Sequence, residues 1–319
     1  MNKIGDMICT LPLLRTLRKE YPAAGLTVLA DASNHEMLEA APFVDNVLVF
    51  RKSSGLMANR YLTVMRALSG YSFDLVIAVK GGFSSFLAIA ALLSGARCRV
   101  GYVSAERPLV SRLYTLPVAP IDFSAFHQVE ACLHLAAVLG VQEMIRDISL
   151  EIPSAYRQHA IESLHNKHLK PRERLVLMNV SNNRVTSTWP ADKFIELGRL
   201  AGKRYGAKCI VTGIDADAEQ IGRICAAIGD MAHYIKCGKA LDFAALAANC
   251  NLLVAGDGGA SHMGAAVGSR VISLFGATSP VIWSPYGEQH CVLQRPDGDA
   301  RNITVEEVAA VIEAGGVFA

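Results

Sequence analysis

An aspartate, two glycines and a histidine stand close together where an apolar run gives way to small residues: Asp257, Gly258, Gly259 and His262. The run 252–255 is typical of a strand, and the small residues after it are typical of a helix. The free N–H groups at a helix start attract anions, and glycine lets a ligand approach the backbone. The pattern therefore predicts a phosphate or pyrophosphate site. The alternative is an ordinary strand-to-helix turn that Asp257 caps.

The elements that must position this turn follow from the alternation of strand-like and helix-like segments. Strands are expected at 26–30, 46–50, 74–79, 97–102, 175–179, 208–212, 233–235, 252–255 and 271–275. Helices are expected at 7–20, 34–40, 56–68, 84–93, 126–139, 155–168, 191–203, 217–228, 242–248 and 304–314, and a loop at 4–6. The run 74–79 is continuously apolar, which is typical of a strand buried on both faces of a parallel sheet. This alternation predicts βαβ units.

The alternation pauses over the more highly charged segment 141–170 and then restarts. We therefore expect two doubly wound α/β domains, 1–150 and 151–319. In such sheets ligands bind beyond the carboxyl ends of the strands, so a site is expected in a cleft that the two domains face. The closing helix 304–314 begins with a capping box, in which Thr304 is followed by Glu307. It is expected to pack back on the first domain.

Composition narrows the class of protein. The chain has 319 residues, a net charge of +2 and 51% hydrophobic residues. No window reaches the roughly 18–20 uncharged apolar residues that span a bilayer. The small net charge gives no case for nucleic acid as a partner. The eight cysteines form no C-x-x-C pair, which indicates reduced core residues. We expect a cytoplasmic protein.

Three motifs in this order resemble a known family, the ADP-heptose:lipopolysaccharide heptosyltransferases of glycosyltransferase family 9. The first is 4–18, a Gly-Asp loop followed by a helix of the Thr-Pro-Leu-Leu-Arg kind. The second is 257–268, an Asp-Gly-x-x-x-His turn before a small-residue helix, and the third is 274–280. The resemblance covers nearly the whole chain. It implies the GT-B fold, two Rossmann-like α/β halves, here without the first strand of the N-terminal half.

The resemblance also implies a mechanism. ADP-heptose would bind the C-terminal domain, with its pyrophosphate at Gly258 and Gly259 and with His262 able to hydrogen-bond it or to neutralise its charge. Asp6 would be the general base that deprotonates an acceptor hydroxyl bound by the N-terminal domain, and the anomeric carbon would invert. No metal and no cofactor are implied. The alternatives are that Asp6 caps the helix after it and that His262 is a satisfied, half-buried histidine.

Two departures from the family pattern bear on the site. Ser187 stands where the family usually has a phosphate-contacting lysine, and Arg184 is the candidate to replace it, since a guanidinium suits phosphate oxygens. A solvent-exposed loop arginine is the alternative. Asn182 and Asn183 match positions that contact the nucleotide sugar. The family's first strand should precede Lys3, and we expect the true start to lie upstream or the copy to be truncated.

The first interpretation is thus an inverting, metal-independent heptosyltransferase that acts on an inner-core lipopolysaccharide saccharide. The expected partners are ADP-heptose and a lipid-linked saccharide acceptor. A peripheral contact of the protein with the cytoplasmic face of the inner membrane is a further possibility. Arg15, Arg18 and Lys19 could meet an acidic acceptor or anionic lipid, or they form a solvated helix face. The alternatives are another nucleotide-sugar transferase or an epimerase of the same fold, or a catalytically inactive binding module.

Overall fold

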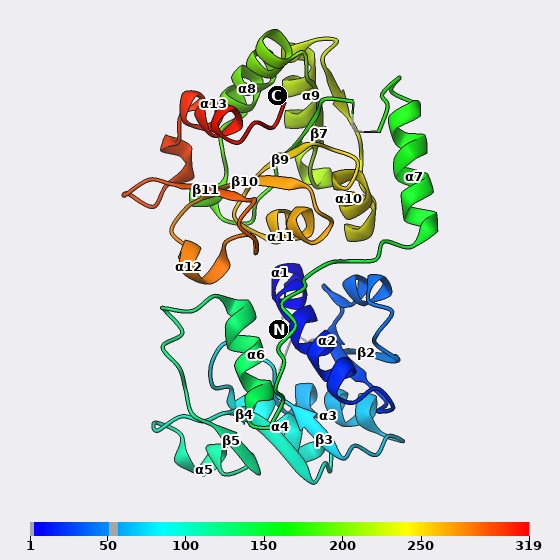
Figure 1. The fold of residues 1–319 in the computed structure, drawn as a ribbon, viewed down its shortest axis with the longest axis vertical. Coiled ribbons are helices and arrows are strands. Elements are labelled where there is room, and N and C mark those ends of the chain that lie inside the picture. Colours follow the sequence, from blue (N-terminus) through cyan, green and yellow to red (C-terminus); the bar gives the residue numbers. More distant parts are fainter. Residues whose placement is uncertain (1–2, 51–56, 172, 319) are drawn as a thin grey trace. The chain divides into compact units, whose positions relative to one another are not determined.

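The computed structural model describes residues 3–50, 57–171 and 173–318, and the side chains of 57 and 58 are outside that description. The chain divides into two compact units, 1–148 and 149–319, with the division two residues before the predicted one. Both units are built from parallel strands and helices (Figure 1), so the predicted α/β class is confirmed. The predicted start of the third helix, Leu56, and the upstream strand lie outside the described residues.

The first unit holds two parallel sheets among its described residues, β1-β2 and β3-β4-β5. Its strands are β1 (Thr27–Asp31), β2 (Asn46–Phe50), β3 (Leu75–Ile77), β4 (Cys98–Tyr102) and β5 (Leu116–Val118). Its helices are α1 (Ile4–Ile8), α2 (Leu11–Glu20), the 3-10 helix η1 (His35–Ala40), α3 (Met57–Leu68), α4 (Ser85–Leu93), α5 (Pro108–Ser111) and α6 (Gln128–Ala137). The sequence did not predict β5 or α5, which are very short.

The start of this unit corrects a prediction. Residues 4–6 were expected to form a loop and 7–20 a single helix, but α1 takes in the supposed loop and ends before α2 begins. Pro12 explains the break, because proline has no N–H for the carbonyl of Ile8 and its ring crowds that carbonyl. Asp6 therefore lies in the first turn of a short helix.

The second unit holds one six-stranded parallel sheet in the order β11-β10-β9-β6-β7-β8. Its strands are β6 (Leu175–Asn179), β7 (Lys208–Thr212), β8 (Ala232–Tyr234), β9 (Leu252–Gly256), β10 (Arg270–Phe275) and β11 (Cys291–Gln294). Its helices are α7 (Ser154–His165), the 3-10 helix η2 (Val185–Ser187), α8 (Ala191–Tyr205), η3 (Asp215–Asp217), α9 (Ala218–Ile228), α10 (Ala240–Ala247), α11 (Gly259–Ala266), α12 (Pro280–Trp283), η4 (Ala300–Asn302) and α13 (Val305–Ala314). The order reverses at β6, so β6 and β9 flank a topological switch point.

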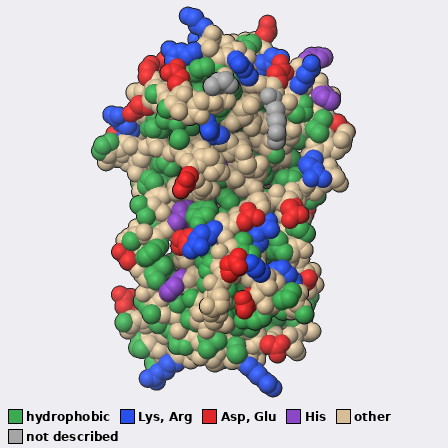
Figure 2. Space-filling view, viewed as in Figure 1, with side chains coloured by type: hydrophobic (Ala, Val, Ile, Leu, Met, Phe, Trp, Pro, Cys, Tyr) green, Lys and Arg blue, Asp and Glu red, His purple; other side chains and the backbone are tan. Residues whose placement is uncertain are grey.

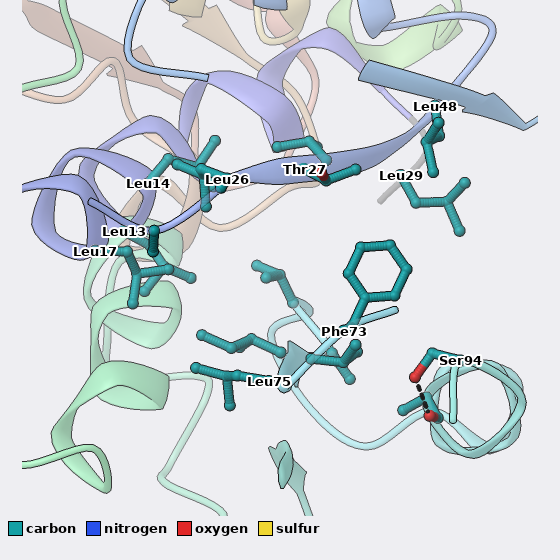
Figure 3. Close-up of a pocket in the computed structure, with 18 of the residues that line it drawn as sticks. Leu13, Leu14, Leu17, Leu26, Thr27, Leu29, Leu48, Phe73, Leu75 and Ser94 are labelled. Atoms are coloured by element: carbon teal, nitrogen blue, oxygen red, sulfur yellow. Dashed lines mark hydrogen bonds between the residues drawn. The ribbon is translucent and has the colours of Figure 1, made fainter. Parts of the chain in front are cut away.

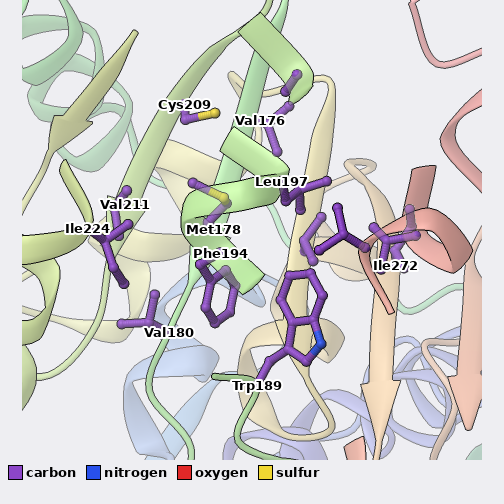
Figure 4. Packing of buried hydrophobic residues seen from close by; sticks show 14 of the residues in the cluster. Val176, Met178, Val180, Trp189, Phe194, Leu197, Cys209, Val211, Ile224 and Ile272 are labelled. Carbon is purple, nitrogen blue, oxygen red and sulfur yellow. The ribbon is translucent and has the colours of Figure 1, made fainter. Parts of the chain in front are cut away.

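The core of the second unit packs α8 and the segment before it against the sheet. Phe194 and Leu197 lie on the buried stripe of α8, and Trp189 packs edge-on against Phe194 with 5.0 Å between ring centroids (Figure 4). The Trp189 indole N–H donates to the carbonyl of Ile303 at 3.0 Å. That bond ties the segment before α8 to the segment before α13.

The closing helix α13 has the predicted capping box. Its Thr304 hydroxyl accepts from the N–H of Glu307 at 3.2 Å, and the Glu307 carboxylate accepts from the N–H of Thr304 at 2.7 Å. Its buried side chains, Val305, Val308 and Ile312, belong to the core of the second unit. The expectation that this helix packs back on the first domain stays a prediction.

The surface charge, the helices and the possible metal ligands give three further findings. On the face seen in Figure 2, acidic and basic side chains are interspersed and neither sign covers a large area. In the described part of the chain, every helix is too short or too polar to cross a membrane. The same residues contain no cluster of three or more His, Cys, Asp or Glu side chains able to hold a metal ion.

Candidate functional site

The polar loops of the second unit meet at its topological switch point. β6 and β9 are neighbours in the sheet, so the loop after β6 and the turn after β9 begin side by side. Asn182 donates through Nδ2 to the backbone carbonyl of Asp257 at 2.8 Å, and its Oδ1 accepts from the N–H of Arg184 at 2.9 Å. The structure thus brings together three residues that the sequence predicted as one site.

Asp257 and Arg184 form an ion pair at this point. Arg184 donates through a terminal guanidinium nitrogen to Oδ2 of Asp257 at 2.8 Å, and the hydroxyl of Thr278 also donates to Oδ2. The Asp257 side chain is 4% exposed, whereas that of Arg184 is 41% exposed. The carboxylate of Asp257 is therefore buried and already paired, and it is not open to solvent as a simple turn cap would be. It is a buried anchor that fixes one side of an exposed guanidinium.

Two glycines make the close approach of the loops possible. A Cβ on Gly256, the last residue of β9, would lie 2.1 Å from the carbonyl oxygen of Ser187 and 2.6 Å from Nδ2 of Asn182. A Cβ on Gly276, just after β10, would lie 2.5 Å from the carbonyl oxygen of Thr186. Real Cβ atoms do not approach that closely, so only glycine lets η2 sit against the ends of both strands.

The start of α11, beside the ion pair of Asp257 and Arg184, is partly exposed to solvent. Gly258 precedes the helix with φ 158° and ψ −165°, a combination that essentially glycine alone adopts. Gly258, Gly259 and Ala260 are partly exposed. The first N–H groups of a helix have no partner within it, so those of α11 are available to an anion, with the positive end of the helix dipole behind them. The predicted phosphate cradle has the geometry to bind one.

Ser187 and His262, both predicted to belong to the donor site, are buried. Ser187 is fully buried under Gly276, so its hydroxyl would touch a ligand only if η2 moved away. His262 was expected to reach a phosphate or to be half-buried, and it is 3% exposed. Its ring lies edge-on to Trp283, with 6.4 Å between centroids. Small neighbours on α11 let the helix pack closely and enclose the imidazole.

Asp6 lies in the first unit, in the first turn of α1, and is partly exposed. Its Oδ2 accepts from the backbone N–H of Lys3 at 3.2 Å, as in a capping box, and its carbonyl accepts from the hydroxyl of Thr10 at 2.8 Å. The alternative capping role is thus real in the structure. The role as a base stays a prediction beside it.

Two residues of the site were missed. Thr278 stood inside the third motif but was given no role, and it shares the carboxylate of Asp257 with Arg184. Gln294 of β11 holds the loop after β10 by donating through Nε2 to the carbonyls of Gly276 at 2.6 Å and Thr278 at 2.9 Å. Neither contact could be found without the strand order, because Thr278 reaches Asp257 across the neighbours β9 and β10, and Gln294 reaches its two carbonyls across the neighbours β10 and β11.

Comparison with known families decides the class of protein. The family model of glycosyltransferase family 9 (heptosyltransferase) matches residues 61–308, which is most of the chain. The chain belongs to glycosyltransferase family 9. It is therefore a glycosyltransferase, and the resemblance carried by the three motifs is confirmed.

Individual relatives agree with the family. The chain is 24% identical to lipopolysaccharide heptosyltransferase 3 of Escherichia coli K12 over 302 residues, 90% of this chain and 84% of the relative. The crystal structure of a family 9 glycosyltransferase from Veillonella parvula matches with a TM-score of 0.87 and 21% identity, over 99% of this chain and 94% of that one. E. coli heptosyltransferase WaaC with ADP-2-deoxy-2-fluoro heptose matches with a TM-score of 0.79 and 20% identity, over 99% and 98%. The predicted GT-B fold is confirmed.

Proposed function

We propose that this family 9 enzyme transfers heptose from ADP-heptose to an inner-core saccharide of lipopolysaccharide, with inversion and without a metal. The observation that carries the proposal is the exposed guanidinium of Arg184, which Asp257 holds at 2.8 Å beside the open start of α11. The solved relative WaaC contains an ADP-heptose analogue, which supports a diphosphate-linked heptose as the donor.

The donor half of the reaction is assigned to the second unit. The diphosphate lies against the N–H groups of Gly258 and Gly259, and Arg184 binds its oxygens with the guanidinium nitrogens that Asp257 leaves free. When the bond between the anomeric carbon and the diphosphate breaks, negative charge grows on the departing ADP. Fixed N–H dipoles and a fixed guanidinium stabilise that charge without having to reorient.

The acceptor half is assigned to the first unit. Asp6 takes the proton of the acceptor hydroxyl as its oxygen attacks the anomeric carbon from the face opposite the leaving ADP. One new C–O bond forms, one C–O bond to the diphosphate breaks, and the configuration inverts. Lys3 holds Oδ2 of Asp6 through its backbone N–H at 3.2 Å, which helps to orient the carboxylate. The acceptor is a lipid-linked sugar, met at the membrane surface.

The test is transfer onto heptose-deficient lipopolysaccharide with ADP-heptose, UDP-sugars and GDP-sugars compared in parallel. The expected product is an acceptor heavier by one heptose, formed from the ADP donor only. Arg184→Ala is expected to weaken ADP binding about 10- to 100-fold, the worth of a charge-assisted hydrogen bond. Arg204→Ala is the matched control, since Arg204 also forms an ion pair, with Glu313 at 2.6 Å, and lies where α8 leads into the amino end of β7.

Each other outcome identifies a different function. An altered donor sugar without transfer means an epimerase, and transfer from a UDP- or GDP-sugar means another transferase. Donor binding without turnover on any acceptor means a binding module. Equal losses in Arg184→Ala and Arg204→Ala would remove the assignment of the donor site, because a general loss of stability would then explain both.

A further inference from the structure

The first unit contains a long cavity of about 640 Å³ that the proposed reaction does not use. It lies between β1 on one side and β3 on the other, and α2 and α4 border it (Figure 3). Leu13, Leu14 and Leu17 of α2 point into it opposite Leu75 of β3. Two strand edges and two helices thus bound one open space, which is the arrangement that surrounds a central strand of a doubly wound sheet.

Each of the two strands that border the cavity, β1 and β3, is the edge strand of its sheet. β1 pairs with β2 on one side and β3 pairs with β4 on one side. Neither pairs with a further strand across its other edge within the described residues. Backbone N–H and C=O groups in an apolar space need hydrogen-bond partners, and an uncovered strand edge readily accepts another strand.

The two edges run in the same direction. Asn34, three residues after β1, donates through Nδ2 to the carbonyl of Lys3 at 3.3 Å, so the carboxyl end of β1 is at the start of α1. Gly81, four residues after β3, lies against the amide of Gln128 in α6. Gln128 hydrogen-bonds Cys132, which also hydrogen-bonds Thr10, two residues after the end of α1. Both carboxyl ends therefore lie at α1, and a strand can be parallel to both.

The lining decides the chemistry of the occupant. Leucine, valine, alanine and isoleucine dominate it, and its charged side chains are Arg18 and Asp74. Arg18 is already committed, donating to the carbonyl of Phe43 at 3.0 Å and forming an ion pair with Asp45. The occupant must be uncharged along its length, yet it must match alternating N–H and C=O groups on both sides. An acyl chain meets the first demand and not the second, whereas an extended apolar peptide meets both.

We propose that this cavity, the strand slot, binds an extended apolar peptide segment as a strand parallel to both β1 and β3. Five residues of strand extend about 16 Å at about 3.3 Å per residue, comparable with the five residues of β1. The carboxyl end of the peptide lies beside Lys3 and Asn34. Its side chains are apolar on both faces, since α2 and α4 each border the slot. Binding joins the two sheets of the first unit into one.

The probe is the synthetic peptide acetyl-Lys-Val-Ile-Val-Val-Lys-amide, added to the whole protein. The matched probe has prolines in place of the two middle residues, which removes two N–H donors. The first peptide is expected to bind at least about tenfold more tightly, the equivalent of one to two hydrogen bonds. By hydrogen exchange and mass spectrometry it should protect fragments 27–31 and 75–79 and leave the second unit unchanged.

Orientation and location have their own controls. A diazirine at the carboxyl end of the peptide should label residues 32–37, and one at the amino end should not. Ala91→Phe fills the slot from α4 and should weaken binding at least about tenfold, whereas Leu92→Phe, on the exposed side of the same helix, should not. If Ala91→Phe does not fold, the two peptides still decide the question.

Three results would overturn the proposal. Equal binding of the two peptides, or binding without protection of both strands, removes the strand. Protection of the slot by octyl glucoside alone, with no binding of the peptide, assigns it to acyl chains. A dimer whose formation protects 27–31 and 75–79 in the absence of peptide assigns it to a second copy of the chain.

Discussion

The most direct perturbation of the donor site adds one carbon atom to Gly256. In Gly256→Ala the new Cβ would lie 2.1 Å from the carbonyl oxygen of Ser187, where an ordinary contact needs 3.4 Å or more. The loop must therefore retreat by about 1.3 Å, because the oxygen belongs to the backbone and has no rotamer to change. The neighbouring Asn182 amide, 2.6 Å from the same Cβ, must also move.

The retreat has two costs. Overpacking of this kind destabilises a protein by about 1–3 kcal/mol. It also displaces η2, and with it Arg184, which leads into η2 and is held by Asp257. A misplacement of about 1 Å can cost about 100-fold in rate, so the transfer rate is expected to fall by about 10- to 100-fold and ADP affinity by about 10-fold. Gly276→Ala should act alike, since its Cβ would meet the carbonyl of Thr186 at 2.5 Å.

The control is Gly222→Ala. Gly222 lies inside α9 of the same unit, and its Cβ would meet nothing within 4 Å. This change should stabilise the protein by about 0.5–1 kcal/mol through helix propensity and leave ADP binding unchanged. The assays are thermal unfolding, ADP titration by calorimetry, and transfer to the acceptor. If Gly256→Ala keeps the melting temperature and ADP affinity of the native chain, the close approach of η2 has no role in donor binding.

Three further predictions concern single side chains. Asp6→Asn should lower the transfer rate by about 100- to 10,000-fold, the worth of a general base, and leave ADP affinity nearly intact; an equal loss of both contradicts a base. Burial, with a smaller contribution from Arg270, lowers the pKa of His290 to about 4. Between about pH 6.5 and 4 the unfolded chain binds a proton at His290 that the folded chain does not bind. The free energy of unfolding therefore falls as pH falls, by up to about 1.4 kcal/mol per pH unit. In urea unfolding, His290→Gln should show a free energy of unfolding that depends less on pH. Trp189→Phe should cost only about 1–2 kcal/mol in urea unfolding, because Lys193 still donates to the Ile303 carbonyl at 2.7 Å; a loss above about 3 kcal/mol would mean that the indole N–H is indispensable.

The second unit could be predicted well because its strands are buried on both faces. β6 and β7 have the bounds that their apolar runs predict, and β9 and β10 each differ by one residue. The two short strands β5 and β11 gave no such signal. β11 has four residues at a sheet edge, none of them fully buried, and β5 has three residues, so neither forms an apolar run long enough to be recognised as a strand. The break between α1 and α2 follows from Pro12 and could have been predicted from it.

The residues of the proposed donor site were predictable in kind but not in arrangement. Glycines after an apolar run indicated an anion site, and the start of α11 has the geometry of one. The role of Asp257 depends on partners 73 and 21 positions away, Arg184 and Thr278. Those partners meet because β9 lies between β6 and β10. Hydrophobic periodicity predicts strands but not their order, so it could not distinguish an anchor from a cap.

The missing lysine illustrates how the backbone redirects a side chain's function. Ser187 ends the 3-10 helix η2, and Arg184 precedes it by one turn of three residues. The N–H of Ser187 donates to the carbonyl of Arg184 at 3.0 Å, so the two residues open and close the same 3-10 turn. Position 187 is buried, whereas Arg184 is partly exposed and has Asp257 to fix it. A longer side chain one turn earlier, held by a buried carboxylate, can thus present a positive charge at the site from which a lysine at 187 would otherwise have to emerge.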